Sequence, residues 1–154
     1  MKSQNTNQAG LDKKQEVKLP RVFFAALTLC LIAFSIMPLA ATPQKNAISI
    51  YAAFPTADLH VTGTFTATGS LNVSGVAVMD VVPNANGMIA HCVLTLTAHD
   101  GSGTITIHQE CQFASAPIKG VWEIVSGTGA YANLKGNGSL LMPGNDEDMS
   151  GYIY

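Results

Sequence analysis

The segment HCVLTLTAHDGSGTITIHQECQF (residues 91–113) carries the pattern that decides the fold of this 154-residue chain. On both sides of a central Asp-Gly-Ser-Gly (residues 100–103), every second residue is apolar except Gln109, and the residues between are mostly Thr, His, Glu or Gln. Alternation with a period of two predicts half-buried strands. Because Gly and Ser between two such runs are typical of a tight turn, the segment predicts a β-hairpin.

The turn also predicts the register of this hairpin. If Gly101 and Ser102 form a two-residue turn with Gly first, as a type II′ turn prefers, Cys92 lies directly opposite Cys111. The pairs on that face would be Ala90–Phe113, Cys92–Cys111, Leu94–Gln109, Leu96–Ile107 and Ala98–Ile105. A slip by one residue would mix the polar and apolar faces, so we expect this face to lie in the core.

Cys92 and Cys111 are predicted to form a disulfide. Directly opposite residues in a β-ladder have Cβ atoms ~4.5–5.5 Å apart, or closer in a non-hydrogen-bonded pair, which is close to disulfide reach. Such a bridge forms in an oxidising compartment and would stabilise the domain by about 3 kcal/mol in the chain-entropy model. The alternatives are two buried free thiols or, less favoured because there is no second cysteine pair, a metal site.

The N-terminal part of the chain predicts export. Residues 1–21 are polar and basic, and the run VFFAALTLCLIAFSIMPLAA (residues 22–41) contains no charged residue. As a helix rising ~1.5 Å per residue, that run would be about 30 Å long, enough to span a bilayer core. The basic residues before it place residues 1–21 in the cytoplasm by the positive-inside rule and send the rest of the chain across. Residues 22–41 are thus either a cleaved signal peptide, which leaves a secreted domain, or a transmembrane anchor.

The charge balance argues against binding to nucleic acid. Residues 43–154 contain three Lys, no Arg and eight Asp or Glu, a net charge of −5, whereas residues 1–42 carry five Lys or Arg against two acidic residues, a net charge of +3. Phosphate backbones are bound by clustered cations, which the larger part lacks. The sequence leaves the oligomeric state open.

The rest of the chain is also predicted to be strands. Period-two alternation or β-favouring composition recurs at about seven places, with a candidate eighth strand at residues 47–53. We therefore expect residues 42–56 to be a linker with a candidate first strand, and residues 57–154 to form one all-β domain. Periodicity alone leaves a sandwich and a closed barrel both open.

The glycine-rich stretch GTGAYANLKGNG (residues 127–138) invites comparison with a dinucleotide-binding loop. Such a loop must open a helix, and a segment with this density of Gly and Asn is a poor helix former. A structural role therefore fits residues 127–138 better than dinucleotide binding does. We expect Gly127 and Gly129 to supply positive φ for a reversal, Tyr131 and Leu134 to plug the core, and Gly136 and Gly138 to permit close strand approach.

The longer run GVWEIVSGTGAYANLKGNG (residues 120–138) resembles a signature of small exported bacterial proteins of unknown function, grouped with the allene oxide cyclase and dirigent-like barrels. The resemblance implies an antiparallel barrel of about eight strands with an apolar interior. In the chain, this barrel would follow the hydrophobic helix expected at residues 22–41. Plant members of the wider group cyclise a fatty-acid epoxide or steer the coupling of phenoxy radicals. The motif residues are Trp122, Gly127, Gly129, Tyr131, Leu134, Gly136 and Gly138.

Two polar groups are candidates for metal binding, each with a simpler alternative. His91, His99 and His108, with Glu110, lie on the polar face of the hairpin and would suit a metal only if that face lined a cavity. Residues 145–148 (Asn-Asp-Glu-Asp) are rich in oxygen ligands but lack the spacing of a calcium loop. We expect both groups to lie in solvent, with no metal or cofactor bound.

No catalytic constellation can be assembled from the sequence. We therefore expect a non-catalytic exported module that binds a small apolar ligand or acts at the envelope surface. The alternative is a cofactor-independent cyclase or isomerase acting on an apolar substrate inside the barrel, with Glu123, Tyr131 or His60 as its polar groups.

Overall fold

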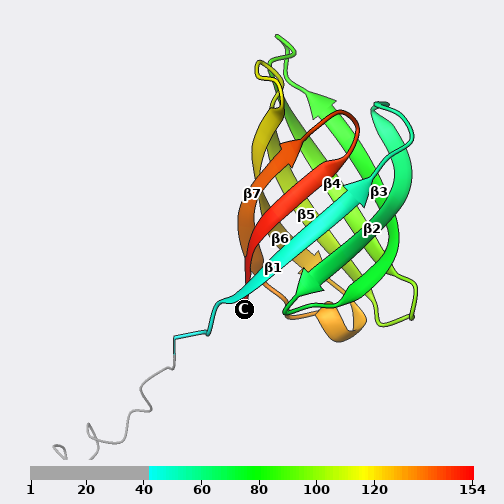
Figure 1. Ribbon diagram of the computed structural model, residues 1–154, viewed down its shortest axis with the longest axis vertical. Coiled ribbons are helices and arrows are strands. Elements are labelled where there is room, and N and C mark those ends of the chain that lie inside the picture. Colours follow the sequence, from blue (N-terminus) through cyan, green and yellow to red (C-terminus); the bar gives the residue numbers. More distant parts are fainter. Residues whose placement is uncertain (1–41) are drawn as a thin grey trace, which may run out of the picture. The chain divides into compact units, whose positions relative to one another are not determined.

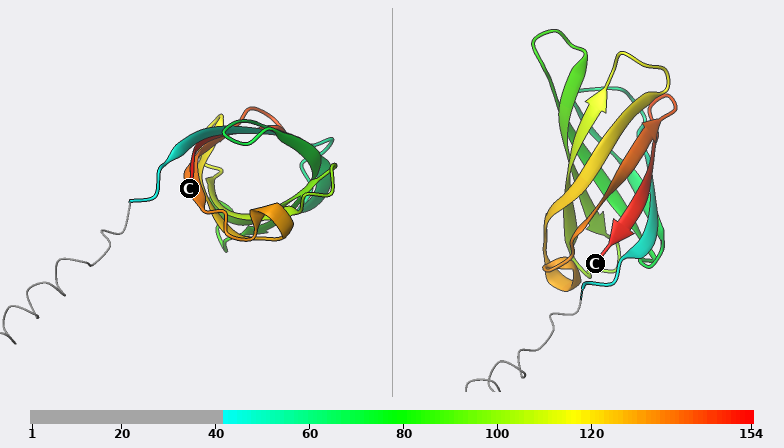
Figure 2. Two further views of the ribbon diagram at one scale, coloured as in Figure 1. Left: turned by 90° about the horizontal axis from the view of Figure 1, so that it is seen from below. Right: turned by 90° about the vertical axis from the view of Figure 1, so that its left-hand side faces the viewer.

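The computed structural model describes residues 42–154, so the predictions for residues 1–21 and 22–41 lie outside the described residues. The described part is a closed barrel of eight antiparallel strands (Figure 1). Each strand pairs with the next one along the chain, and the last pairs with the first, so that an end-on view shows a ring (Figure 2). The strands are β1 (Asn46–Ala53), β2 (His60–Gly69), β3 (Val73–Pro83), β4 (Ile89–Ala98), β5 (Thr104–Gln112), β6 (Ile118–Gly127), β7 (Gly136–Met142) and β8 (Glu147–Ile153).

The barrel forms because its strands alternate inward apolar and outward polar residues. In β4, for example, Cys92, Leu94 and Leu96 are buried, and the residues between them are exposed or half-buried. Closure leaves no unpaired strand edge, and every residue of the hydrophobic core lies between Ile48 and Ile153. Residues 42–154 thus contain all the partners of their own strands and form a compact unit by themselves.

The first strand extends the domain towards the N-terminus. The candidate strand at residues 47–53 is present as β1, and it pairs with both β2 and β8. The barrel therefore begins at Asn46, within residues 42–56, which were expected to be a linker with a candidate first strand.

The predicted register of the β4–β5 hairpin was wrong by two residues. Cys92 is paired with Gln109, and Ala90 with Cys111, because the turn has four residues and not two. The Asp100 side chain accepts a hydrogen bond from the Ser102 backbone N–H at 2.9 Å, which favours this longer turn. A shift of two residues keeps every side chain on its predicted face, so the assignment of the apolar face to the core was correct.

The glycine motif makes room for the single tryptophan. Trp122 on β6 is buried, is paired with Gly138, and donates a hydrogen bond from Nε1 to the Ser139 carbonyl at 3.0 Å. Gly138 is paired with Gly151 on β8. A Cβ added to Gly151 would lie 2.7 Å from the indole ring of Trp122. A Cβ on Gly138 would collide with the carbonyl oxygen of Ser150. Close strand approach at Gly138, as predicted, is confirmed.

The reversal after β6 closes one end of the barrel. Tyr131, in the short 3-10 helix η1 (Gly129–Tyr131), is buried, and Leu134 packs against the core, which confirms their predicted role as plugs. Gly129 has a positive φ of 60°, as predicted. Gly127 does not, so that prediction was wrong: a side chain there would instead collide with the Tyr131 carbonyl.

Candidate functional site

The barrel interior holds a buried polar pair. Among the residues that the structure describes, only Gln109 on β5 and Glu147 at the start of β8 are polar or charged side chains that are buried, with 3% and 0% of their surfaces exposed. Gln109 Nε2 donates a hydrogen bond to Glu147 Oε2 at 3.0 Å and lies 3.5 Å from the sulfur of Met149. The other oxygen of each side chain, Gln109 Oε1 and Glu147 Oε1, has no hydrogen-bond partner.

Burial perturbs the ionisation of Glu147. Desolvation raises the pKa of this carboxyl group to about 7, although the hydrogen bond from Gln109 acts in the opposite direction. Every Lys and His side chain between residues 42 and 154 is exposed, so none of them lies in the interior as a counter-ion. The interior therefore contains an acidic group that can gain or lose its proton near neutral pH and has no positive partner within this part of the chain.

Cys92 and Cys111 lie together in the same interior, as free thiols. Their Sγ atoms are 3.9 Å apart and share a hydrogen bond, so the predicted disulfide is not formed in this structure. This hydrogen bond lowers the pKa of Cys92 and raises that of Cys111, because the thiol that ionises first accepts a hydrogen bond from the other. The charge of Glu147 acts on both thiols and favours their neutral forms.

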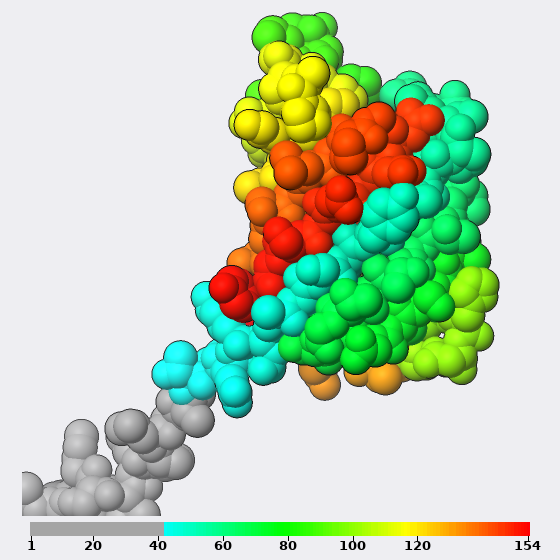
Figure 3. Space-filling view, viewed as in Figure 1, coloured from blue at the N-terminus to red at the C-terminus, as the bar shows by residue number. Residues whose placement is uncertain are grey.

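A pocket of about 370 Å³ opens at one end of the barrel, which we call the mouth. The connections β1–β2, β3–β4, β5–β6 and β7–β8 all contribute to it, and Figure 3 shows the β3–β4 and β5–β6 connections rising above the barrel at this end. Its apolar lining comes from Leu59, Met79, Val81, Phe113, Ile118 and Met142. This mouth pocket lies at the opposite end from η1, which Figure 1 shows at the foot of the barrel.

The mouth pocket adjoins the buried polar groups. Val81, which lines the pocket, is paired with Cys92, and Asn145, which also lines it, precedes Glu147 by two residues. Residues of the pocket lining are thus neighbours, in the sheet or along the chain, of the residues that carry a buried thiol and the buried carboxyl group.

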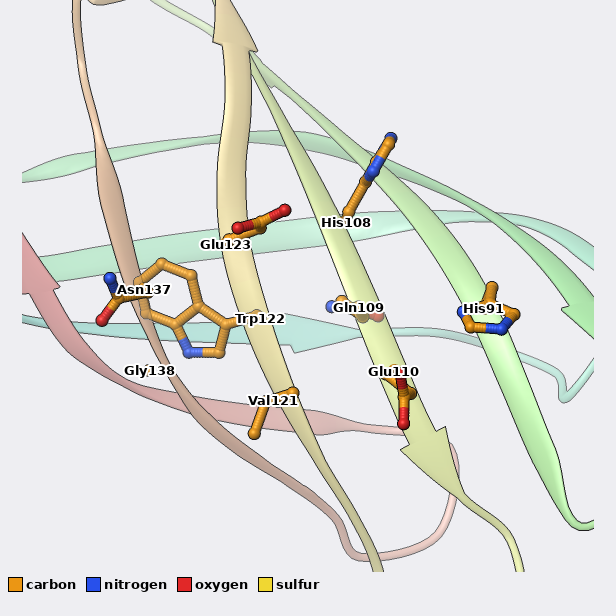
Figure 4. Close-up of a pocket in the computed structure, with 9 residues that line it drawn as sticks. All are labelled: His91, His108, Gln109, Glu110, Val121, Trp122, Glu123, Asn137 and Gly138. Carbon is orange, nitrogen blue, oxygen red and sulfur yellow. The ribbon is translucent and has the colours of Figure 1, made fainter.

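The predicted histidine cluster lies on the outer face of the barrel. A groove of about 530 Å³ there is bordered by His91, His108, Glu110 and Glu123 on β4, β5 and β6 (Figure 4). His91 is paired with Glu110, and His108 with Glu123, across neighbouring strands, while His99 lies in the β4–β5 turn. Within residues 42–154, no group of three His, Cys, Asp or Glu side chains is placed to hold a metal ion.

The three residues expected to serve a barrel enzyme do not converge. Glu123 is exposed on the outer face, and His60 is exposed, with its Nδ1 2.6 Å from Asp80 Oδ1. Tyr131 is buried, but its hydroxyl group lies 2.6 Å from that of Ser102 at the closed end.

Residues 145–148 do not form a calcium loop, and their expected exposure was wrong for Glu147. Asp146 accepts a hydrogen bond from the Tyr51 hydroxyl at 2.7 Å, and Asp148 is exposed. Glu147 points into the barrel between them. The signal that sequence reasoning missed is the alternation of Glu147, Met149 and Ile153, all buried, which extends β8 back to residue 147.

Comparison with known proteins identifies the family but no activity. The family described as "Protein of unknown function (DUF3224)" matches residues 35–152. No curated protein and no solved structure matches the chain. In the part of the chain that the structure describes, we find no helix of the length and apolar character needed to cross a membrane.

Proposed function

The chain belongs to the DUF3224 family, whose description gives no function, and from the barrel itself we propose that this domain binds a small apolar ligand in its mouth pocket. The observation that carries the proposal is the apolar pocket of about 370 Å³ at the open end of a barrel whose other end is plugged. Small-molecule sites are commonly concave, largely apolar and found at the mouths of barrels.

The side chains at the mouth suit an adaptable binding site. Met79 and Met142 have unbranched, flexible side chains that can adjust to the shape of a bound molecule. Phe113 and Leu59 are exposed apolar residues at the rim, which water solvates poorly and a ligand would cover.

Export and family relationship form the wider setting of this proposal. The basic residues 1–21 and the apolar residues 22–41 support translocation of the barrel out of the cytoplasm, with residues 22–41 kept as an anchor or removed. The eight-stranded antiparallel closed barrel supports the relationship to the allene oxide cyclase and dirigent-like proteins. We do not extend the proposal to their chemistry, because Glu123, Tyr131 and His60 do not meet in one pocket.

The test is a titration of residues 42–154 with n-octanol, observed through methyl-labelled methionines by NMR. Met79 and Met142 line the pocket and should shift, whereas Met88, which is exposed and does not line it, should not. Absence of saturable shifts at the two lining methionines would refute the proposal.

A pair of matched variants locates the site. Val81 lines the mouth pocket, and Val121 is exposed on the outer face of β6. We expect Val81→Lys to weaken octanol binding by at least about tenfold, because it places a charge beside the apolar lining. Val121→Lys adds the same charge elsewhere and should bind octanol as the unmodified domain does; equal affinities of the two variants would place the ligand outside the mouth.

A further inference from the structure

We infer that Glu147 and Gln109 form a head-group site on the inner side of the mouth pocket, and that it receives an aliphatic ammonium group carried by the apolar ligand. The inference rests on the proposed function, since the mouth pocket must hold the apolar part of the molecule. Its basis is the hydrogen-bonding and charge balance of the two buried side chains.

When Glu147 is ionised, the two side-chain atoms of this pair that lack a hydrogen-bond partner are both acceptors. Gln109 Nε2 already donates to Glu147 Oε2, which leaves Gln109 Oε1 and Glu147 Oε1 without partners at buried positions. Buried polar atoms in proteins almost always have a partner. An ammonium group has three N–H donors and no acceptor, so it can serve two neighbouring oxygen atoms, which a carboxylate ligand cannot do.

The charge balance points to the same ligand class. An ionised carboxylate away from water is costly unless a positive group lies beside it. Around Glu147, the titratable groups that face the same interior are the thiols of Cys92 on β4 and Cys111 on β5, and neither is a cation. Glu147 is paired with Ala52 on β1, which carries no charge, and its neighbours in the sequence, Asp146 and Asp148, are acidic. Above its pKa, the carboxylate can be neutralised only by a positive group from outside the described residues; below it, the carboxyl group is neutral because it holds its own proton.

Residues next to Glu147 in the chain and in the sheet give the route that such a group would take from the mouth pocket. Asn145, two residues before Glu147, and Met142, at the end of β7, both line the mouth pocket. The inward-facing neighbour Ala52 has a small side chain and is fully buried. Movement of the flexible Met142 side chain would connect the apolar lining to the carboxyl group.

The test compares three probes with the same eight-carbon chain, n-octylammonium, n-octanol and octanoate, titrated calorimetrically into residues 42–154 at pH 8. We expect the ammonium to bind at least about tenfold more tightly than the alcohol, since charge-assisted hydrogen bonds are stronger than neutral ones, and octanoate to bind most weakly. Glu147→Gln should abolish the preference for the ammonium and change octanol affinity by less than about threefold. The matched variant Glu123→Gln removes the same charge from the outer face and should keep the preference.

The unmodified domain gives a second measurement that needs no variant. Octylammonium stays charged between pH 5 and pH 8, so its affinity should fall as Glu147 gains its proton, by up to about tenfold per pH unit well below the carboxyl pKa, while octanol affinity stays level. Equal binding of ammonium and alcohol, or a preference that survives Glu147→Gln, would overturn the head-group site and leave the mouth pocket standing. Failure of all three probes to bind would overturn both.

Discussion

Replacing Glu147 by Gln should stabilise the barrel at alkaline pH and flatten its dependence on pH. The carboxyl pKa is raised from 4.5 to about 7 in the folded protein, so the folded state holds its proton more tightly than the unfolded state does. Well below pH 4.5 both states are protonated and the group has no effect. As the pH rises through the window from about 4.5 to 7, the unfolded chain releases the proton first, and the folded state loses stability.

The size of the effect follows from the pKa difference. At 1.36 kcal/mol per unit, a change from 4.5 to about 7 corresponds to about 3 kcal/mol of unfolding free energy, fully lost above pH 7. Glutamine has nearly the same shape and carries no charge. Its amide can accept the hydrogen bond from Gln109 Nε2 and donate to the unpartnered Gln109 Oε1.

Thermal unfolding of residues 42–154 at pH 5 and pH 8 measures this effect. For the unmodified domain, we expect the ionised Glu147 carboxylate to lower the Tm at pH 8. At pH 8, Glu147→Gln should therefore raise the Tm by roughly 10 °C. The matched variant Glu123→Gln, at an exposed position, should leave the Tm nearly unchanged at both pH values.

The comparison of Glu147→Gln with the unmodified domain removes the contribution of all other ionisable groups, because these groups are the same in both proteins. If Glu147→Gln and the unmodified domain have Tm curves with the same slope against pH, the carboxyl group does not titrate between pH 5 and pH 8. If the variant is less stable at pH 8, the carboxylate is stabilised in the fold by a partner, and the reasoning from burial fails.

Two further predictions concern the thiol pair and the tryptophan motif. Protein recovered from outside the cytoplasm should contain a Cys92–Cys111 disulfide, because the two sulfurs are already in contact. Its intact mass should then be lower by two hydrogens than the mass after reduction. Two thiols that can be alkylated after denaturation would contradict this prediction. Gly138→Ala should destabilise the domain by about 2 kcal/mol or more in urea unfolding, because its methyl group would collide with a strand carbonyl. Ser139→Ala, at the next and exposed position, should change stability by less than about 0.5 kcal/mol.

The faces of the strands could be predicted from the sequence, but the exact pairing of β4 with β5 could not. Inward and outward positions follow from alternation, and residues such as Leu94 and Ile107 are buried as predicted. Registers that differ by two residues place the same side chains inside, so the pattern does not distinguish them. The observed register follows from the longer turn, which is favoured by the hydrogen bond that the Asp100 side chain accepts from the Ser102 N–H.

Closure of the barrel could not be predicted from local patterns. It depends on the pairing of β1 with β8, in which Ile50 lies opposite Met149. These residues are far apart in the sequence, and neither segment carries a signal for the other. The resemblance to known barrels suggested about eight strands, and the structure has eight.

The polar pair in the interior was hidden by composition. Gln109 was visible as the one polar residue on the apolar face of the hairpin. Glu147 lies in Gly144-Asn-Asp-Glu-Asp148, which has the composition of an exposed turn. Only the alternation of Glu147 with Met149 and Ile153 indicates that the Glu147 side chain points inside. This pattern of three residues is weak, because residues 144–148 are all polar or small.

The two ends of the barrel differ in a way that bears on where a ligand can enter. At the end closed by η1, Tyr131 fills the interior and its hydroxyl group lies 2.6 Å from the Ser102 hydroxyl, so the buried polar atom there has a partner. Towards the mouth, Glu147 is buried at a cost that glutamine at the same position would avoid. Residues that lower stability without a structural need are typical of binding sites, where they are retained for what they bind. A ligand that reaches Glu147 should therefore enter at the mouth, and substitutions at the closed end should alter stability without altering its affinity.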